Sequence, residues 1–85
     1  MKKIVEVEAG LEALIGKRVL IMTSGFFYSG TLSGVNSSCV ELENPAIVYS
    51  TGGHDASSFD DEQPLPEDVW YVQASSIESF GATDR

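Results

Sequence analysis

Residues 17–35 read KRVLIMTSGFFYSGTLSGV, two apolar runs separated by the pair Ser24-Gly25. The first run, Lys17 to Thr23, is rich in strand-forming residues, and a Ser-Gly pair favours a tight hairpin turn. A second strand is expected from Phe26 to about Val35. Alternation assigns its residues to two faces: Phe26, Tyr28, Gly30, Leu32 and Gly34 on one, and Phe27, Ser29, Thr31, Ser33 and Val35 on the other.

Gly30 and Gly34 fall on the same face of this second strand. Glycine inside a strand costs conformational entropy, and it usually marks a bulge, a sharp bend or another backbone at close range. We therefore expect the second strand to curl around a small barrel.

The flanking segments predict a short helix before these strands and further strands after them. Residues 8–15 place Leu11, Leu14 and Ile15 at helical spacing, and Gly16 follows where a left-handed cap belongs. A third strand is expected over 39–43, with an interruption at Asn44-Pro45 because proline cannot donate a ladder hydrogen bond. The remaining expected segments are a resumed strand over 46–50, an acidic, solvated and mobile loop over 51–66, strands over 69–72 and 77–80 within residues 67–80, and a fraying tail over 81–85.

Size and charge narrow the classes of function. The 85 residues, 9.1 kDa in mass, suit a single domain, residues 1–85, with a thin core. The net charge is -8, and residues 19–84 hold ten of the thirteen acids but no Lys or Arg. Because nucleic-acid affinity comes mostly from cationic side chains at phosphates, a strongly attractive nucleic-acid groove is disfavoured.

The single cysteine, Cys39, excludes an internal disulfide framework and a cysteine-rich zinc module. Glu6 and Glu8 precede any apolar run long enough for a secretion signal, and no run reaches the roughly 18 to 20 residues of a membrane span. A cytoplasmic protein without a membrane partner is expected.

Two motifs resemble the Sm-like family, which includes the Sm and LSm proteins and bacterial Hfq. Gly25, Tyr28, Gly30 and Leu32 match the first motif of that family, which reads Gly, two free positions, an aromatic, one free position, Gly, one free position, Leu. Residues 72–80 keep only the apolar skeleton of the second motif. The resemblance implies a helix-capped, strongly bent, five-stranded SH3-like open barrel. In that family the fourth strand of one subunit pairs with the fifth strand of the next and closes a ring.

Exposed sheet edges support the same assembly on physical grounds, because strand addition around a ring removes them. We expect a homo-oligomer of five to seven subunits. The alternative is that both Trp70 and Tyr71 are barrel core, although alternation places one of them outside. The expected interface residues are Val69, Trp70, Tyr71, Val72, Ile77 and Phe80.

The RNA-binding positions that the resemblance implies are largely substituted. Asn36 stands where the family has Asp, and Ser38 replaces the side chain that stacks on a base; Gln73 replaces an Arg. Base stacking on an aromatic contributes roughly 1 to 3 kcal/mol, so its loss weakens the grip on single-stranded RNA. The remaining candidates for polar contact, by family position, are Asn36, Ser37, Ser38, Gln73 and Ser75. The alternative is that the serines only satisfy turn backbone.

Lys17 and Arg18 are candidates for phosphate contacts at the helix-side rim, or they only solubilise the entrance of the first strand. His54-Asp55 with Asp60, Asp61 and Glu62 lacks the order of a calcium loop and a second His for zinc, so no metal and no cofactor are expected. No nucleophile or phosphate-loop motif suggests an enzyme. The expected function is a ring with weak or specialised RNA binding; the alternative is a scaffold ring that holds a protein partner through its acidic loop or apolar rim.

Overall fold

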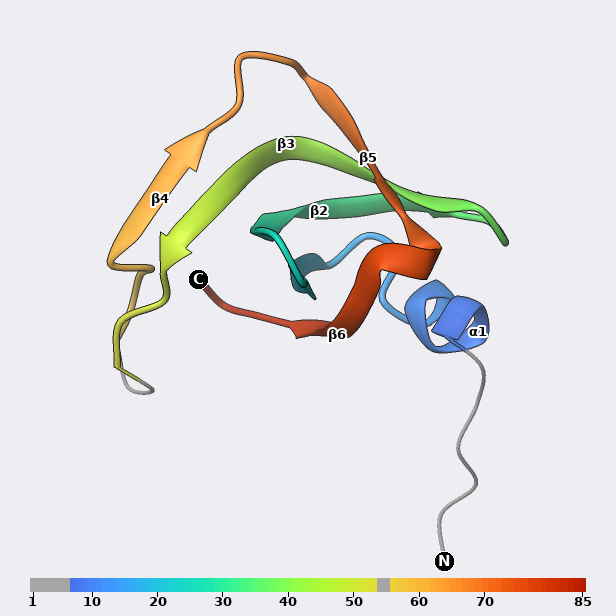
Figure 1. The fold of residues 1–85 in the computed structure, drawn as a ribbon, viewed down its shortest axis with the longest axis horizontal. Coiled ribbons are helices and arrows are strands. Elements are labelled where there is room, and N and C mark those ends of the chain that lie inside the picture. The colour runs from blue at the N-terminus through green and yellow to red at the C-terminus, as the bar shows by residue number, and fades with distance from the viewer. Residues whose placement is uncertain (1–6, 54–55) are drawn as a thin grey trace, which may run out of the picture.

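The computed structural model describes residues 7–53 and 56–85 and shows a mostly β chain with one short helix. Figure 1 shows a curved sheet with the helix at one end. The elements are α1 (Val7–Glu12), β1 (Arg18–Thr23), β2 (Phe27–Val35), β3 (Cys39–Ser50), β4 (Asp61–Pro64), β5 (Val69–Gln73), the 3-10 turn η1 (Ala74–Ser76) and β6 (Ile77–Ala82). No helix within these described residues is long and apolar enough to cross a bilayer.

The long strand β3 organises the sheet. All pairings are antiparallel, and the order is β4-β3-β2-β1-β6, with β5 also paired to β3. Residues 39–43 of β3 pair with β5, whereas residues 46–50 pair with β4. The described residues therefore form six strands where five were expected, because β4 arises inside the segment that was predicted to be a loop.

The predicted interruption of the third strand is a bend within one continuous strand. Asn44 adopts a left-handed conformation, with φ of 49°, and the buried Pro45 follows it. The backbone N–H of Asn44 donates to the carbonyl of Asp68 at 3.1 Å, and the carbonyl of Pro45 accepts from Leu65 at 2.9 Å. Other chain segments thus satisfy the backbone groups that leave the ladder, and β3 exchanges β5 for β4 at this point.

Gly30 faces the bend from β2, and of the alternatives that its position in the strand left open, the structure shows a register shift and another backbone at close range. The β2–β3 register shifts between Ser29 and Thr31. A Cβ at Gly30 would lie 3.0 Å from the carbonyl oxygen of Glu43 and 3.2 Å from Cβ of Leu42. The absence of a side chain lets the bent β3 approach β2 closely.

A second register shift, between Leu32 and Gly34, changes which face Val35 occupies. Strict alternation placed Val35 with Phe27, away from Leu32, but Val35 pairs with Val40 and packs against the core. The prediction for Val35 was wrong because the bulge adds one residue to β2 and reverses the alternation beyond it.

The core lies between the sheet and α1. Its buried members are Leu11, Val19, Ile21, Leu32, Val40, Leu42 and Val72, and Leu14, Tyr28, Val35, Trp70, Ile77 and Phe80 pack around them. The helix ends at Glu12 rather than residue 15. Leu14 and Lys17 donate to carbonyls three residues earlier, Leu11 and Leu14, each at 2.9 Å, so the chain continues in tight turns to Gly16, whose φ is 90°. Leu11 is buried and Ile15 remains 47% exposed.

Candidate functional site

The structure brings the predicted RNA-contacting residues together at one end of the sheet. Asn36, Ser37 and Ser38 form the turn between β2 and β3, and Cys39 pairs with Gln73. The backbone N–H of Ala74 donates to the carbonyl of Ser38 at 2.9 Å. This contact joins the turn to η1, which contains Ser75.

Within this polar end, the side chain of Asn36 is committed to the turn. Its Oδ1 accepts hydrogen bonds from the backbone N–H groups of Ser38 at 2.7 Å and Cys39 at 2.9 Å. Ser37, Ser38, Gln73 and Ser75 are exposed. The five predicted residues therefore offer hydroxyl and amide groups but neither a cationic group nor an aromatic face, so their contact with a nucleic acid would rest on neutral hydrogen bonds.

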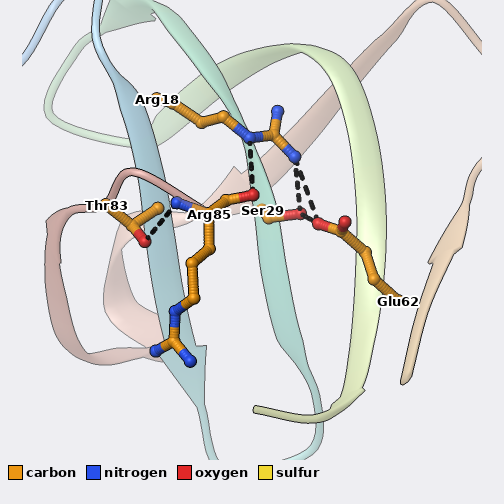
Figure 2. A network of polar contacts seen from close by, with 5 residues as sticks. All are labelled: Arg18, Ser29, Glu62, Thr83 and Arg85. Atoms are coloured by element: carbon orange, nitrogen blue, oxygen red, sulfur yellow. Dashed lines mark hydrogen bonds and ion pairs between the residues drawn. The ribbon is translucent and has the colours of Figure 1, made fainter. Parts of the chain in front are cut away.

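The two rim bases differ in their availability. Lys17 is exposed, whereas Arg18 is half-buried in a polar network, shown in Figure 2. The Nη2 of Arg18 lies 3.1 Å from Oε2 of Glu62, and Ser29 Oγ also hydrogen-bonds that carboxylate oxygen. Nε of Arg18 donates to the backbone carbonyl of Arg85 at 3.3 Å. A phosphate at Arg18 would have to displace Glu62.

Arg85 ties the C-terminal residues to the segment after β3. Its guanidinium lies 4.6 Å from the ring centroid of Phe59 and donates through Nη1 to the carbonyls of Thr51 at 2.8 Å and Gly53 at 3.2 Å. Its backbone N–H donates to Oγ1 of Thr83 at 3.1 Å, also visible in Figure 2. We call Arg85, Phe59 and the two carbonyls the Arg85 clasp.

The structure differs from the predictions for residues 51–66 and 81–85. Phe59 is only 6% exposed, and β4 pairs with β3, so residues 51–66 are not a uniformly solvated loop. Gly81 and Ala82 belong to β6, so the last strand extends two residues into the expected tail, and Thr83 and Arg85 make hydrogen bonds beyond it. A sequence signal existed, because Phe59 is the one large apolar residue in the acidic segment 51–64 and Arg85 the one base after Arg18.

The predicted interface residues divide between the core and the surface. Trp70 and Val72 point inward, whereas Val69 and Tyr71 are exposed at 37% and 60%. Ile77 and Phe80 pack against the core. Alternation correctly separated Trp70 from Tyr71, but Val72 is buried within its own subunit. Within the described chain, β5 pairs only with β3 and β6 only with β1, which leaves one edge of each strand without a partner.

A second polar cluster crosses β2, β3 and β5 on the outer face. Ser33 Oγ donates to Oε1 of Glu41 at 2.7 Å, and the hydroxyl of Tyr71 donates to Oε2 at 2.9 Å. The hydrogen bonds from Ser33 and then Tyr71 stabilise the carboxylate and lower the pKa of Glu41 below 4.5. The hydrogen bond to Glu41 raises the pKa of Tyr71 above 10.0.

The described residues contain no group of three or more His, Cys, Asp or Glu side chains placed to hold a metal ion. His54 and Asp55, two of the donors considered above, lie outside those residues. Cys39 is a half-buried strand residue with a free thiol. No known family profile matches the chain, and neither does any curated protein sequence.

Proposed function

We propose that this protein is an Sm-like open barrel whose copies join through β5 and β6 into a homo-oligomeric ring of five to seven subunits. The ring serves as a non-catalytic scaffold with weak affinity for single-stranded RNA. The observation that carries the proposal is the strand order. When β4 is treated as an addition to the connecting segment, the order is β5-β3-β2-β1-β6, which leaves the two strands needed for pairing between subunits at the two ends.

The contrast between the sheet edges supports this assignment. The strand β4 carries Asp61, Glu62 and Pro64, and charges and proline are features that block strand addition. The strand β5 reads VWYVQ and has no charge or proline, and β6 has one charged residue, Glu78. Unpaired backbone groups on such apolar edges favour pairing with another strand.

The weak affinity for RNA follows from two groups of residues: the turn of Asn36, Ser37 and Ser38, and the bases Lys17 and Arg18. Asn36 Oδ1 is occupied by the turn, and Arg18 is paired with Glu62. Lys17 is then the exposed base of the rim. Among the described residues, one exposed base per subunit at the rim, in a chain of net charge -8, gives little phosphate neutralisation.

Sedimentation of the purified protein tests the assembly. The wild type should sediment as a species several subunits in mass, and Tyr71→Asp should shift it toward the monomer because a charge enters the β5 edge. Tyr49→Asp is the matched control, since Tyr49 is exposed to a similar degree, 59% against 60%, on β3. A wild-type monomer at micromolar concentration would contradict the ring, as would equal behaviour of the two variants.

A further inference from the structure

Two strongly exposed aromatic side chains lie together at the end of the β2–β3 pair. Phe26 is 50% exposed and Tyr49 is 59% exposed. With Gly25, Phe27 and Val48 they line a shallow pocket of about 240 Å³. The ring of Phe26 also stands 6.4 Å from that of Tyr28, centroid to centroid, at an interplanar angle of 58°. The core of the subunit does not use these faces, so they are free for a ligand.

A carboxylate accompanies the aromatic rings. Gln63 of β4 pairs with Ile47 of β3, and its amide donates to Oδ1 of Asp61 at 2.8 Å, so Gln63 and Asp61 share one face of β4. Ile47 and Tyr49 share the corresponding face of β3, on the opposite side from the buried Val48. Asp61 is exposed and pairs with Ser50 beyond a register shift between Val48 and Ser50, where the extra β3 residue leaves Tyr49 and Ser50 opposite Asp61. Aromatic faces and a negative charge thus meet on one side of the sheet.

The chemistry of this surface selects a cation. Aromatic faces attract an ammonium or guanidinium group through the ring quadrupole, and a nearby carboxylate adds to the attraction. A planar guanidinium can also stack on a ring, which an ammonium cannot. The same chain already uses such a contact internally, where the guanidinium of Arg85 lies 4.6 Å from the Phe59 centroid. The net charge of -8 further favours a positively charged partner.

We propose that Phe26, Tyr49 and Asp61, here called the aromatic–acidic patch, bind an arginine side chain in a basic segment of a partner protein. All three residues belong to one subunit, so the patch does not depend on the assembly of a ring. If copies join as proposed above, the patches repeat around the ring and bind a segment with several arginines more tightly through multivalency.

Fluorescence anisotropy with a labelled peptide that alternates glycine with five arginines tests the patch. The wild type should bind this peptide. It should bind two analogues less tightly: one with citrulline, which keeps the shape of arginine and loses the charge, and one with lysine. Phe26→Ser and Tyr49→Ser should each weaken binding by about two- to fivefold, the range expected for one exposed cation–π contact. Asp61→Asn should also weaken it.

Two variants serve as matched controls. Ile15→Ser removes an apolar side chain of similar exposure, 47%, from the turn after α1, and Glu12→Gln removes one negative charge from α1. Both should bind the arginine peptide like the wild type. Equal losses in Asp61→Asn and Glu12→Gln, or no loss in Phe26→Ser and Tyr49→Ser, would show diffuse charge attraction and overturn the proposal.

The same variants distinguish an arginine segment from two other possible ligands of the aromatic–acidic patch, a nucleic acid and a second copy of the chain. Displacement of the arginine peptide by oligo-U, with the oligo-U binding itself lost in Tyr49→Ser, would assign the patch to a nucleic acid and overturn the proposal. A loss of oligomeric mass in Phe26→Ser would assign the patch to a second copy of the chain and also overturn it. Unchanged sedimentation of Phe26→Ser supports the proposal and separates its outcome from that of the ring, which Tyr71→Asp tests.

Discussion

Gly30 is a residue at which the addition of a single methyl group should lower the stability of the fold. A Cβ there would meet the Glu43 carbonyl at 3.0 Å, and that carbonyl belongs to the backbone of the bend in β3. We expect Gly30→Ala to lower the free energy of unfolding by about 1 to 3 kcal/mol, the usual cost of overpacking. Urea denaturation followed by circular dichroism measures this change.

Gly34→Ala is the matched control for Gly30→Ala, because both glycines lie in β2. Around a Cβ at Gly34, Glu41 atoms would lie at 3.7 and 3.9 Å, which is ordinary van der Waals contact. Gly34→Ala should be neutral or slightly stabilising, since alanine reduces the conformational freedom of the unfolded chain. Equal destabilisation by the two substitutions would contradict a special role for Gly30.

The hydrogen bond between Tyr71 and Glu41 should make stability depend on pH. The pKa of Glu41 is lower in the folded chain than its ordinary value of 4.5, so its contribution is present above that value and is lost as pH falls through the folded-state pKa. The pKa of Tyr71 is raised above 10.0, so its contribution is present below that value and is lost as pH rises through the folded-state pKa. The pair therefore stabilises the fold across the window between about pH 4.5 and 10.

Urea denaturation of the wild type and of Tyr71→Phe at a series of pH values measures this dependence. The stability difference should be largest near pH 7 and should narrow on both the acid and the alkaline side. Tyr28→Phe is the control, because Tyr28 is not part of the cluster with Glu41. A difference between wild type and Tyr71→Phe that is constant from pH 3 to pH 11 would contradict the assigned contact.

At the scale of elements, the Arg85 clasp holds residues 51–53 and 56–60 against the rest of the molecule. The described residues of this segment, 51–53 and 56–60, belong to no strand, and their attachment depends on the buried Phe59 and on two carbonyls that Arg85 contacts. We expect Arg85→Ala to speed amide hydrogen exchange in residues 51–60 and in β4 by roughly fivefold or more, with a small loss of global stability. Hydrogen exchange followed by mass spectrometry measures the effect.

Asp84→Ala is the control for Arg85→Ala, because Asp84 is exposed and neighbours Arg85 in sequence. Its exchange profile should match that of the wild type. Unchanged exchange over 51–60 in Arg85→Ala would show that Phe59 alone holds the segment, and faster exchange throughout all strands would show a general loss of stability.

The sequence predicted strands correctly where the local sequence pattern agreed with the surroundings of the segment in the folded chain. The first strand, the turn at Ser24-Gly25 and the second strand were placed within a residue of β1 and β2, since their apolar runs are bounded by strong turn residues. The prediction missed β4, because Asp61, Glu62, Gln63 and Pro64 have no strand propensity. Their extended conformation depends on the free edge of β3 beyond its bend.

At the scale of the whole molecule, net charge should dominate the response to nucleic acid. We expect oligo-U, oligo-A and single-stranded DNA to bind weakly, with dissociation constants well above the micromolar range at physiological salt, and Lys17→Ala to weaken any residual binding at low salt. Fluorescence anisotropy at two salt concentrations measures both effects. Micromolar binding with a steep salt dependence would contradict the weak-affinity assignment.

The pairing of Arg18 with Glu62 illustrates why the candidate site was only partly predictable. From the sequence, Arg18 was a rim base and Glu62 one of several loop acids, 44 positions apart. The structure joins them beside the buried Ser29, so a phosphate at Arg18 would compete with the Glu62 carboxylate. The structure also places the Asn36–Ser38 turn beside Gln73, while contact of these residues with RNA stays a prediction.

By itself the sequence determined the mostly β class, the first two strands and the excess of negative charge, because propensity and turn chemistry act over a few neighbouring residues and charge follows from composition. Only the tertiary structure decided the bend at Asn44-Pro45, the strand β4, the inward position of Val35 and the Arg85 clasp. Each of these depends on groups far apart in the chain. Their hydrogen bonds and burial become available only after β3 has folded across the molecule.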